Sequence, residues 1–127
     1  MKVIDNVIYI NRGDEGRLPF KIPIKEQTDG KKFYQFKVGD VVTFGVYNKK
    51  GYDEPALILK KITIEKTTET CYIPLASDDT RFGELINKET EYWYEISLNK
   101  ETVLGHRHRK DGGARILWLL PEGSDKQ

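Results

Sequence analysis

Apolar residues recur at every second position along most of the chain, and this spacing is typical of half-buried β-strands. The alternation is regular from Leu18 to Ile24 and from Tyr92 to Leu98. Aromatic and β-branched residues, which suit a pleated surface, supply most of these positions. The pattern predicts strands over residues 7–10, 18–24, 33–36, 41–47, 56–64, 70–75, 91–98, 103–104 and 114–120, the first of them preceded by a short paired stretch.

Turn residues separate these segments at intervals of roughly 8–12 residues, which is the spacing of an antiparallel sandwich or barrel. Glycine and aspartate mark the breaks, among them Arg12-Gly13-Asp14 and Gly39-Asp40. Pro19 and Pro23 cannot donate a hydrogen bond to a neighbouring strand, so we expect the strand that contains them at an edge or at bulges. These local signals leave the choice between sandwich and barrel open.

One stretch has helical rather than strand spacing. Ser77 to Thr80 supply capping side chains, and Phe82, Leu85 and Ile86 follow three and four residues apart. We therefore expect one short helical turn near residues 78–86, too short to form a layer of the fold. A chain of 127 residues fits a single domain, which we place at residues 1–121, with a polar C-terminal tail at residues 122–127.

Charge and composition narrow the class of function. The chain has 21 lysine and arginine residues against 20 aspartate and glutamate residues, a net charge of +1, which argues against a general nucleic-acid binder. Its single cysteine, Cys71, cannot form a disulfide within the chain, which is compatible with a reducing cytosol. No segment reaches the roughly 20 apolar residues of a membrane span, and Met1 to Ile10 lack the apolar core of a signal peptide. We expect a protein made in the cytoplasm without a signal peptide and without a membrane partner.

Arg12-Gly13-Asp14 is the tripeptide that integrins read on exposed loops. Its chemistry there is an arginine and a carboxylate displayed on opposite sides of a tight glycine turn. A glycine turn is needed at this point in any case, because two predicted strands meet here. We therefore interpret the tripeptide as a structural turn.

A basic segment with two imidazoles precedes the last predicted strand. His106 and His108 stand two apart, and they would need a third ligand to hold a divalent metal. The surrounding arginine and lysine side chains would repel a cation, so we predict no metal site. An exposed hairpin tip that grips an acidic partner or a phosphate fits the charge better. The candidate interaction patch comprises Arg107, His108, Arg109, Lys110 and Arg115.

Nucleophilic catalysis would need a serine or cysteine beside a histidine and an orienting carboxylate. Cys71 and Ser97 lie within predicted strands, Ser124 lies in the tail, and Asp78-Asp79 fit a helix cap. No motif in the chain matches the mechanics of a known catalytic site. We predict a protein that is not an enzyme, with no catalytic residues and no cofactor.

Four aromatic residues could stack on a sugar ring or a base if their side chains were exposed: Tyr47, Tyr52, Trp93 and Trp118. The simpler interpretation is that a sandwich of this size buries most of its large aromatics between its two sheets. The alternative function that this set leaves open is a carbohydrate-binding module. That alternative requires Trp93 and Trp118 to be exposed on one face.

A more specific pattern is carried by four segments in a fixed order. They are Ile10 to Gly16 followed by Leu18 to Ile22, then Phe36 to Phe44 with its glycine–aspartate turn, then Ile73 to Leu75 with Asp79-Thr80, and lastly Glu91 to Leu98 with Gly105 and Ala114 to Leu119. In this order they resemble the immunoglobulin-like N-terminal attachment domain of upper baseplate and tail proteins of bacteriophages and prophages of Gram-positive bacteria. The chain departs from that pattern at His106 to Arg109, where such domains commonly carry an apolar or threonine-containing strand.

The resemblance implies an all-β fold, an antiparallel immunoglobulin-like β-sandwich. It implies a non-enzymatic structural component of a (pro)phage tail or baseplate, which acts as an attachment or adaptor module through protein–protein contacts. The partners it implies are tail and baseplate proteins, and the location it implies is the virion. A neutral total charge with a separate basic patch also suits contacts between copies of the chain, so a homo-oligomer is a further expectation.

Overall fold

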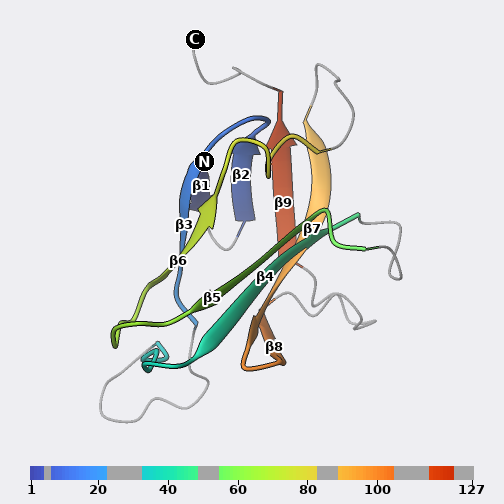
Figure 1. Ribbon diagram of the computed structural model, residues 1–127. Helices are drawn as coiled ribbons and strands as arrows, with labels where there is room; N and C mark the ends of the chain where they lie inside the picture. The colour runs from blue at the N-terminus through green and yellow to red at the C-terminus, as the bar shows by residue number, and fades with distance from the viewer. Residues whose placement is uncertain (5–6, 23–32, 49–54, 83–88, 105–114, 122–127) are drawn as a thin grey trace.

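The computed structural model describes residues 1–4, 7–22, 33–48, 55–82, 89–104 and 115–121, with the backbone alone at residues 102–104 and 115 (Figure 1). This part of the chain forms strands and turns, without a helix. The strands are β1 (Lys2–Ile4), β2 (Val7–Asn11), β3 (Gly16–Phe20), β4 (Val41–Tyr47), β5 (Ile58–Thr63), β6 (Cys71–Leu75), β7 (Thr90–Leu98), β8 (Glu101–Leu104) and β9 (Arg115–Leu120). The all-β class is thereby confirmed. No helix long and apolar enough to cross a membrane occurs among the described residues.

A seven-stranded mixed sheet forms the larger layer, in the order β1-β2-β9-β7-β4-β5 with β8 beside β7. β7 is its centre, because β4 pairs along one edge while β9 and β8 pair with successive parts of the other. The pair of β2 with β9 is parallel, which corrects the expectation of a wholly antiparallel arrangement. Strands from opposite ends of the chain meet here, and local alternation carries no information about such a pairing.

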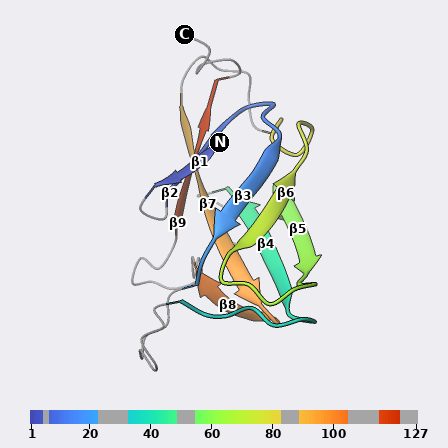
Figure 2. The same cartoon turned by 90° about the vertical axis from the view of Figure 1, so that its left-hand side faces the viewer.

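β3 and β6 form a second, two-stranded antiparallel sheet. Figure 2 shows this small sheet in front of β4, β5 and β7. The Phe20 ring centroid of β3 lies 5.8 Å from that of Phe44 in β4 and 5.9 Å from that of Tyr94 in β7, so the core lies between the two sheets. β3 has an edge position, as Pro19 predicts, whereas Pro23 lies outside the described residues.

The aromatic strand predicted at residues 33–36 is wrong for the described structure. Phe36 makes only an isolated bridge with Thr68, and the Tyr34 and Phe36 rings form an edge-on pair with centroids 5.3 Å apart. The chain turns immediately afterwards, where the Asp40 N–H donates to the Lys37 carbonyl at 3.0 Å. The aromatic residues of this segment therefore pack against other side chains instead of forming a strand.

The helical turn expected near residues 78–86 does not form in residues 78–82, the described part of that range. The Asp79 N–H donates to the Ala76 carbonyl at 3.0 Å, and the Asp79 carboxylate accepts the Ala76 N–H at 2.7 Å. These two bonds close a tight turn, so the capping side chains end a strand instead of starting a helix. Leu85 and Ile86 lie outside the described residues.

Candidate functional site

The outer face of the large sheet, turned away from the small sheet, carries a group of aromatic and aliphatic side chains. Strand alternation places them there, because their immediate neighbours along each strand point into the core. In β7, for example, Tyr92 and Tyr94 are buried, so Trp93 between them faces outward. We call this group the outer apolar band, and its members are Val7, Tyr9, Tyr47, Trp93, Ile116 and Trp118.

The strand register makes the outer apolar band continuous. Trp93 lies opposite Tyr47 of β4 and Ile116 of β9, and Tyr9 of β2 lies opposite Trp118. Side chains that face each other across an antiparallel strand pair have Cβ atoms about 4.5–5.5 Å apart, so Trp93 adjoins Tyr47 and Ile116. All members are half-buried, which leaves a connected surface of ring edges and methyl groups across β2, β9, β7 and β4.

Gly45 provides space for one ring of the band. A Cβ atom at Gly45 would lie 2.6 Å from the Tyr47 hydroxyl oxygen and 2.7 Å from a ring carbon. The Tyr47 ring therefore folds back over the Gly45 backbone on the outer face. The glycine lies opposite Glu95 of β7 and Leu59 of β5, so the ring lies between the two flanking strands.

Acidic side chains share the outer face with the aromatic rings. Glu91 lies opposite Trp118, and Glu95 lies opposite Gly45. At the far side of the sheet, the Lys2 ammonium lies 5.6 Å from the centre of the Tyr9 ring, within cation–π range. Rings flanked by carboxylates and one ammonium can contact an apolar protein surface or the face of a sugar.

The aromatics are thus divided between two surfaces, and the expected burial between the sheets is wrong for Tyr47, Trp93 and Trp118, which are half-buried on the outer face. The core contains Phe20, Phe36, Phe44, Tyr92 and Tyr94, whereas Tyr47, Trp93 and Trp118 lie on the outer face. The physical reason is the strict two-residue period, which sends every second residue outward whatever its size. Tyr52 lies outside the described residues.

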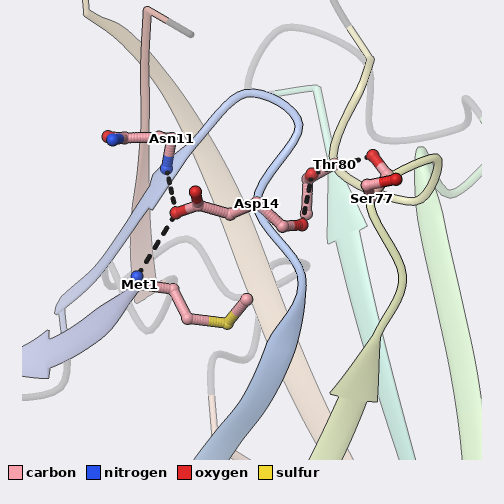
Figure 3. Close-up of polar contacts among 5 residues, drawn as sticks. All are labelled: Met1, Asn11, Asp14, Ser77 and Thr80. Atoms are coloured by element: carbon pink, nitrogen blue, oxygen red, sulfur yellow. Dashed lines mark hydrogen bonds and ion pairs between the residues drawn. The ribbon is translucent and has the colours of Figure 1, made fainter. Parts of the chain in front are cut away.

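The Arg12-Gly13-Asp14 turn joins the two sheets (Figure 3). One Asp14 carboxylate oxygen accepts the Asn11 N–H at 3.0 Å and lies 3.3 Å from the Met1 amino group. The Asp14 carbonyl accepts the hydroxyl of buried Thr80 at 2.8 Å, and the same hydroxyl lies 3.1 Å from the Ser77 carbonyl. This network ties the turn between β2 and β3 to the turn after β6.

The engaged Asp14 carboxylate agrees with the interpretation of the tripeptide as a structural turn. Integrin-type recognition needs that carboxylate to be presented outward, but here it is turned toward Met1 and Asn11. Gly13 has a φ of 89°, a left-handed conformation that glycine adopts without steric cost.

Asp79 forms a second contact between the sheets. Its carboxylate lies 2.9 Å from the Lys60 ammonium of β5 as well as accepting the Ala76 N–H. Burial alone would raise the pKa of Asp79, but the bonds from Lys60 and Ala76 outweigh burial and hold the pKa below its ordinary value. The carboxylate therefore stays ionised and holds the end of β6 against β5.

Asp40 organises the opposite end of the large sheet. Its carboxylate accepts hydrogen bonds from the Tyr34 hydroxyl at 2.7 Å, the Lys37 N–H at 2.9 Å and the Asn99 amide at 3.1 Å. The Lys37 N–H and then the Tyr34 hydroxyl lower the pKa of Asp40, and the same Tyr34–Asp40 bond, helped by burial, raises the pKa of Tyr34 to about 12. The Asn99 side chain also accepts the Val41 N–H at 2.9 Å.

Sequence reasoning singled out Gly39-Asp40 as a turn but missed Tyr34 and Asn99 as its partners. Asn99 and Lys100 both have positive φ, 50° and 77°, which is the two-residue turn of a tight hairpin between β7 and β8. The Asn99-Lys100 pair between two predicted strands was the available signal, because asparagine tolerates this conformation.

The predicted basic patch lies almost wholly outside the described residues. Arg107, His108, Arg109 and Lys110 are among residues 105–114, and Arg115 begins β9 opposite Tyr94. Among the residues that the structure describes, no group of three histidine, cysteine, aspartate or glutamate side chains could hold a metal ion. Cys71 is buried, and burial raises the pKa of its thiol to about 11.

Comparison with known proteins returned no match: no family model, no curated protein and no solved structure is similar to the chain. The outer apolar band and the hydrogen-bond networks of Asp14 and Asp40 are the features of the chain that bear on its function.

Proposed function

We propose that this chain is an immunoglobulin-like attachment module of a phage tail or baseplate, which assembles through protein–protein contacts and catalyses no reaction. The observation that carries the proposal is the outer apolar band. A connected apolar surface on a sheet face, rimmed by charged groups, is a common feature of protein interaction sites. The neighbour that covers it would be a tail or baseplate protein.

The order of the strands supports the immunoglobulin-like part of the proposal. β9, β7, β4 and β5 follow the order G, F, C and C′ of an immunoglobulin-like sandwich. β3 pairs with β6 as strand B pairs with strand E in that fold. The parallel pair of β2 with β9 adds a first strand beside the last one.

The positions of the motif residues support the resemblance to the attachment domain. Asp14 and Thr80 come from two of its segments and meet in one hydrogen bond. Asp40, from another segment, binds Asn99 directly after the segment that ends at Leu98. In each of these hydrogen bonds the donor and the acceptor come from segments that are distant in sequence. This gives a physical reason why the segments occur together in one chain.

Electron microscopy of particles from an induced lysogen tests the proposal. The protein would carry a small epitope tag, and gold-labelled antibody would locate it on purified tails. We expect label at the tail or its tip. Absence of label from every tail preparation, with tagged protein present in the lysate, would refute the proposed function.

A second candidate function is binding of host cell-wall glycans. The observation in its favour is that Trp93 and Trp118 share the outer face with Tyr47 and Glu91, since sugar rings stack on aromatic faces and their hydroxyls bind carboxylates. Titration with purified wall glycan fragments while following tryptophan fluorescence tests this function. A saturable change that Trp118→Ala abolishes would support it, and an unchanged spectrum would exclude it.

A further inference from the structure

The edges of the small sheet are closed to strand addition by proline. Pro19 of β3 lies opposite Tyr72, and Pro74 of β6 lies opposite Arg17. Because proline has no N–H, both prolines occupy pairs that exchange no hydrogen bonds, so their nitrogens face away from the partner strand. Each outer edge of this sheet therefore lacks one of the donors that an added strand would need.

The outer edge of β5 has no such block. β5 pairs only with β4, and with six residues it is the longest of the strands that leave one edge unpaired in the described part of the chain. The Ile64 N–H donates to the Asp40 carbonyl at 2.8 Å. Because hydrogen-bonded and non-hydrogen-bonded pairs alternate along an antiparallel pair, this bond indicates which residues of β5 bond to β4. The N–H and C=O groups of Leu59, Lys61 and Thr63 consequently point away from β4, toward the open edge.

A groove of about 460 Å³ lies beside the C-terminal end of this edge, between β5 and β6. Ile62 and Ile64 line it from the β5 side, and Cys71 and Tyr72 line it from the β6 side. Tyr72 is 49% exposed, and Leu59, on the opposite face of the β5 edge, is 62% exposed. An added strand would therefore find apolar surface for the side chains on both of its faces.

The charge around the groove is mainly positive. Arg17 and Lys66 line it together with Glu65, and Lys61 extends from the open edge itself. Neither Lys61 nor Lys66 forms an ion pair with another residue in the part of the chain that the structure describes. A second copy of β5 paired antiparallel about Lys61 would bring that lysine against its own equivalent, which is unfavourable in a strand pair.

We propose that the open edge of β5 binds an extended acidic segment of a neighbouring protein as an additional strand. The backbone of that segment pairs with Leu59, Lys61 and Thr63, its apolar side chains enter the groove beside Tyr72, and its carboxylates contact Lys61 and Lys66. The inference rests on the proposed attachment function and names one way in which the module holds its neighbour.

Nuclear magnetic resonance with synthetic peptides tests this edge in the whole protein. The probe is a capped peptide of roughly nine residues in which valine alternates with glutamate. We expect saturable shifts of the Leu59, Lys61 and Thr63 amide signals. The same peptide with a central proline, or with lysine in place of glutamate, is expected to bind at least about tenfold more weakly.

Two variants separate backbone pairing from charge. Lys61→Pro removes an N–H that β4 does not use, so the fold is retained and binding falls about tenfold or more. Lys61→Gln removes the charge but keeps a long polar side chain and lowers affinity about threefold, while Lys2→Gln on the distant β1 leaves affinity unchanged. If Lys61→Pro does not fold, the proline-interrupted peptide makes the same distinction with the native protein.

Three results would overturn the proposal. They are the absence of saturation up to about 1 mM peptide, shifts confined to another surface, and equal binding of the interrupted peptide. None of them bears on whether gold label is found on tails, so failure of this inference and failure of the proposed function remain distinguishable.

Discussion

The two faces of the large sheet are both rich in aromatic residues, yet they have different surroundings. On the inner face Phe44 and Tyr94 are fully buried under the small sheet, with ring centroids 6.0 Å apart. On the outer face Tyr47 and Trp93 lie opposite each other but stay half-buried, because no second layer of the described chain covers them. Aromatic residues therefore contribute to stability on the inner face, whereas on the outer face they form a surface that is available for contacts.

The largest expected effect is on the free energy of unfolding, and it compares one residue on each face of the same strand, β4. Phe44→Ala should lower the free energy of unfolding by about 3–5 kcal/mol, because it opens a cavity between the sheets. Tyr47→Ala on the same strand should cost about 1 kcal/mol, since its ring is already half in water. Urea unfolding of both variants measures this, and equal losses would contradict the division into an inner and an outer face.

The next effect concerns the joint that holds the small sheet over the inner face. Thr80→Val keeps the shape of the buried side chain but leaves the Asp14 and Ser77 carbonyls without its hydroxyl, so we expect a loss of about 1–3 kcal/mol. Thr43→Val on the outer face is the matched control and should stay within about 0.5 kcal/mol. Thermal unfolding of both variants gives the comparison, which fails if the two substitutions cost the same.

A smaller effect on stability is expected at Gly45, which leaves space for the Tyr47 ring on the outer face. Gly45→Ala forces the Tyr47 ring away, but only the far end of that ring must move, and alanine gains strand propensity over glycine. Stability should therefore change by less than about 1 kcal/mol, while the Tyr47 ring signals shift and the ring becomes more exposed. Nuclear magnetic resonance spectra with unshifted Tyr47 signals would show that the ring does not lie over Gly45.

The smallest effect is the pH dependence of the Asp40 joint, which lies at the end of the sheet and on neither face. Because folding lowers the pKa of Asp40, its stabilising contribution is present above the unfolded value of 3.8 and is lost as the pH falls through the folded value. Asp40→Asn should therefore flatten the acid limb of the Tm profile, and Asn99→Ala should flatten it in part. An acid limb unchanged in Asp40→Asn would rule out this contribution.

Alternation predicted the strands that have one buried face and one open face. β4 lies at the predicted residues 41–47, and β7 begins one residue before the predicted 91–98, because each alternates between core and surface along its length. The same two-residue period predicted that the side chains of Trp93 and Tyr94 point to different faces of the sheet. It could not reveal that the outer face would stay uncovered, since coverage depends on layers formed elsewhere in the chain.

Local sequence patterns could not predict pairings between segments that are distant in the chain. Nothing near Ile8 or Leu117 indicates that their strands run parallel, and nothing near Asp14 indicates that Thr80 will bind its carbonyl. Ser77 to Thr80 carry the composition of a helix cap, yet the Thr80 hydroxyl donates to one local and one distant carbonyl, and the Asp79 carboxylate accepts the Ala76 N–H instead. Short polar side chains favour caps and turns alike, so their composition alone does not decide between them.

The central claim is that the outer apolar band is the surface by which the module attaches to its neighbour, and particle incorporation measures it most directly. A lysogen lacking the gene would be complemented with tagged native protein, with Trp93→Ser/Trp118→Ser, or with Val38→Ser, which removes an exposed apolar side chain outside both proposed surfaces. We predict that the double variant folds but enters tails at least about tenfold less than native protein, while Val38→Ser leaves incorporation unchanged. Equal incorporation of the native protein and the folded double variant would contradict the account.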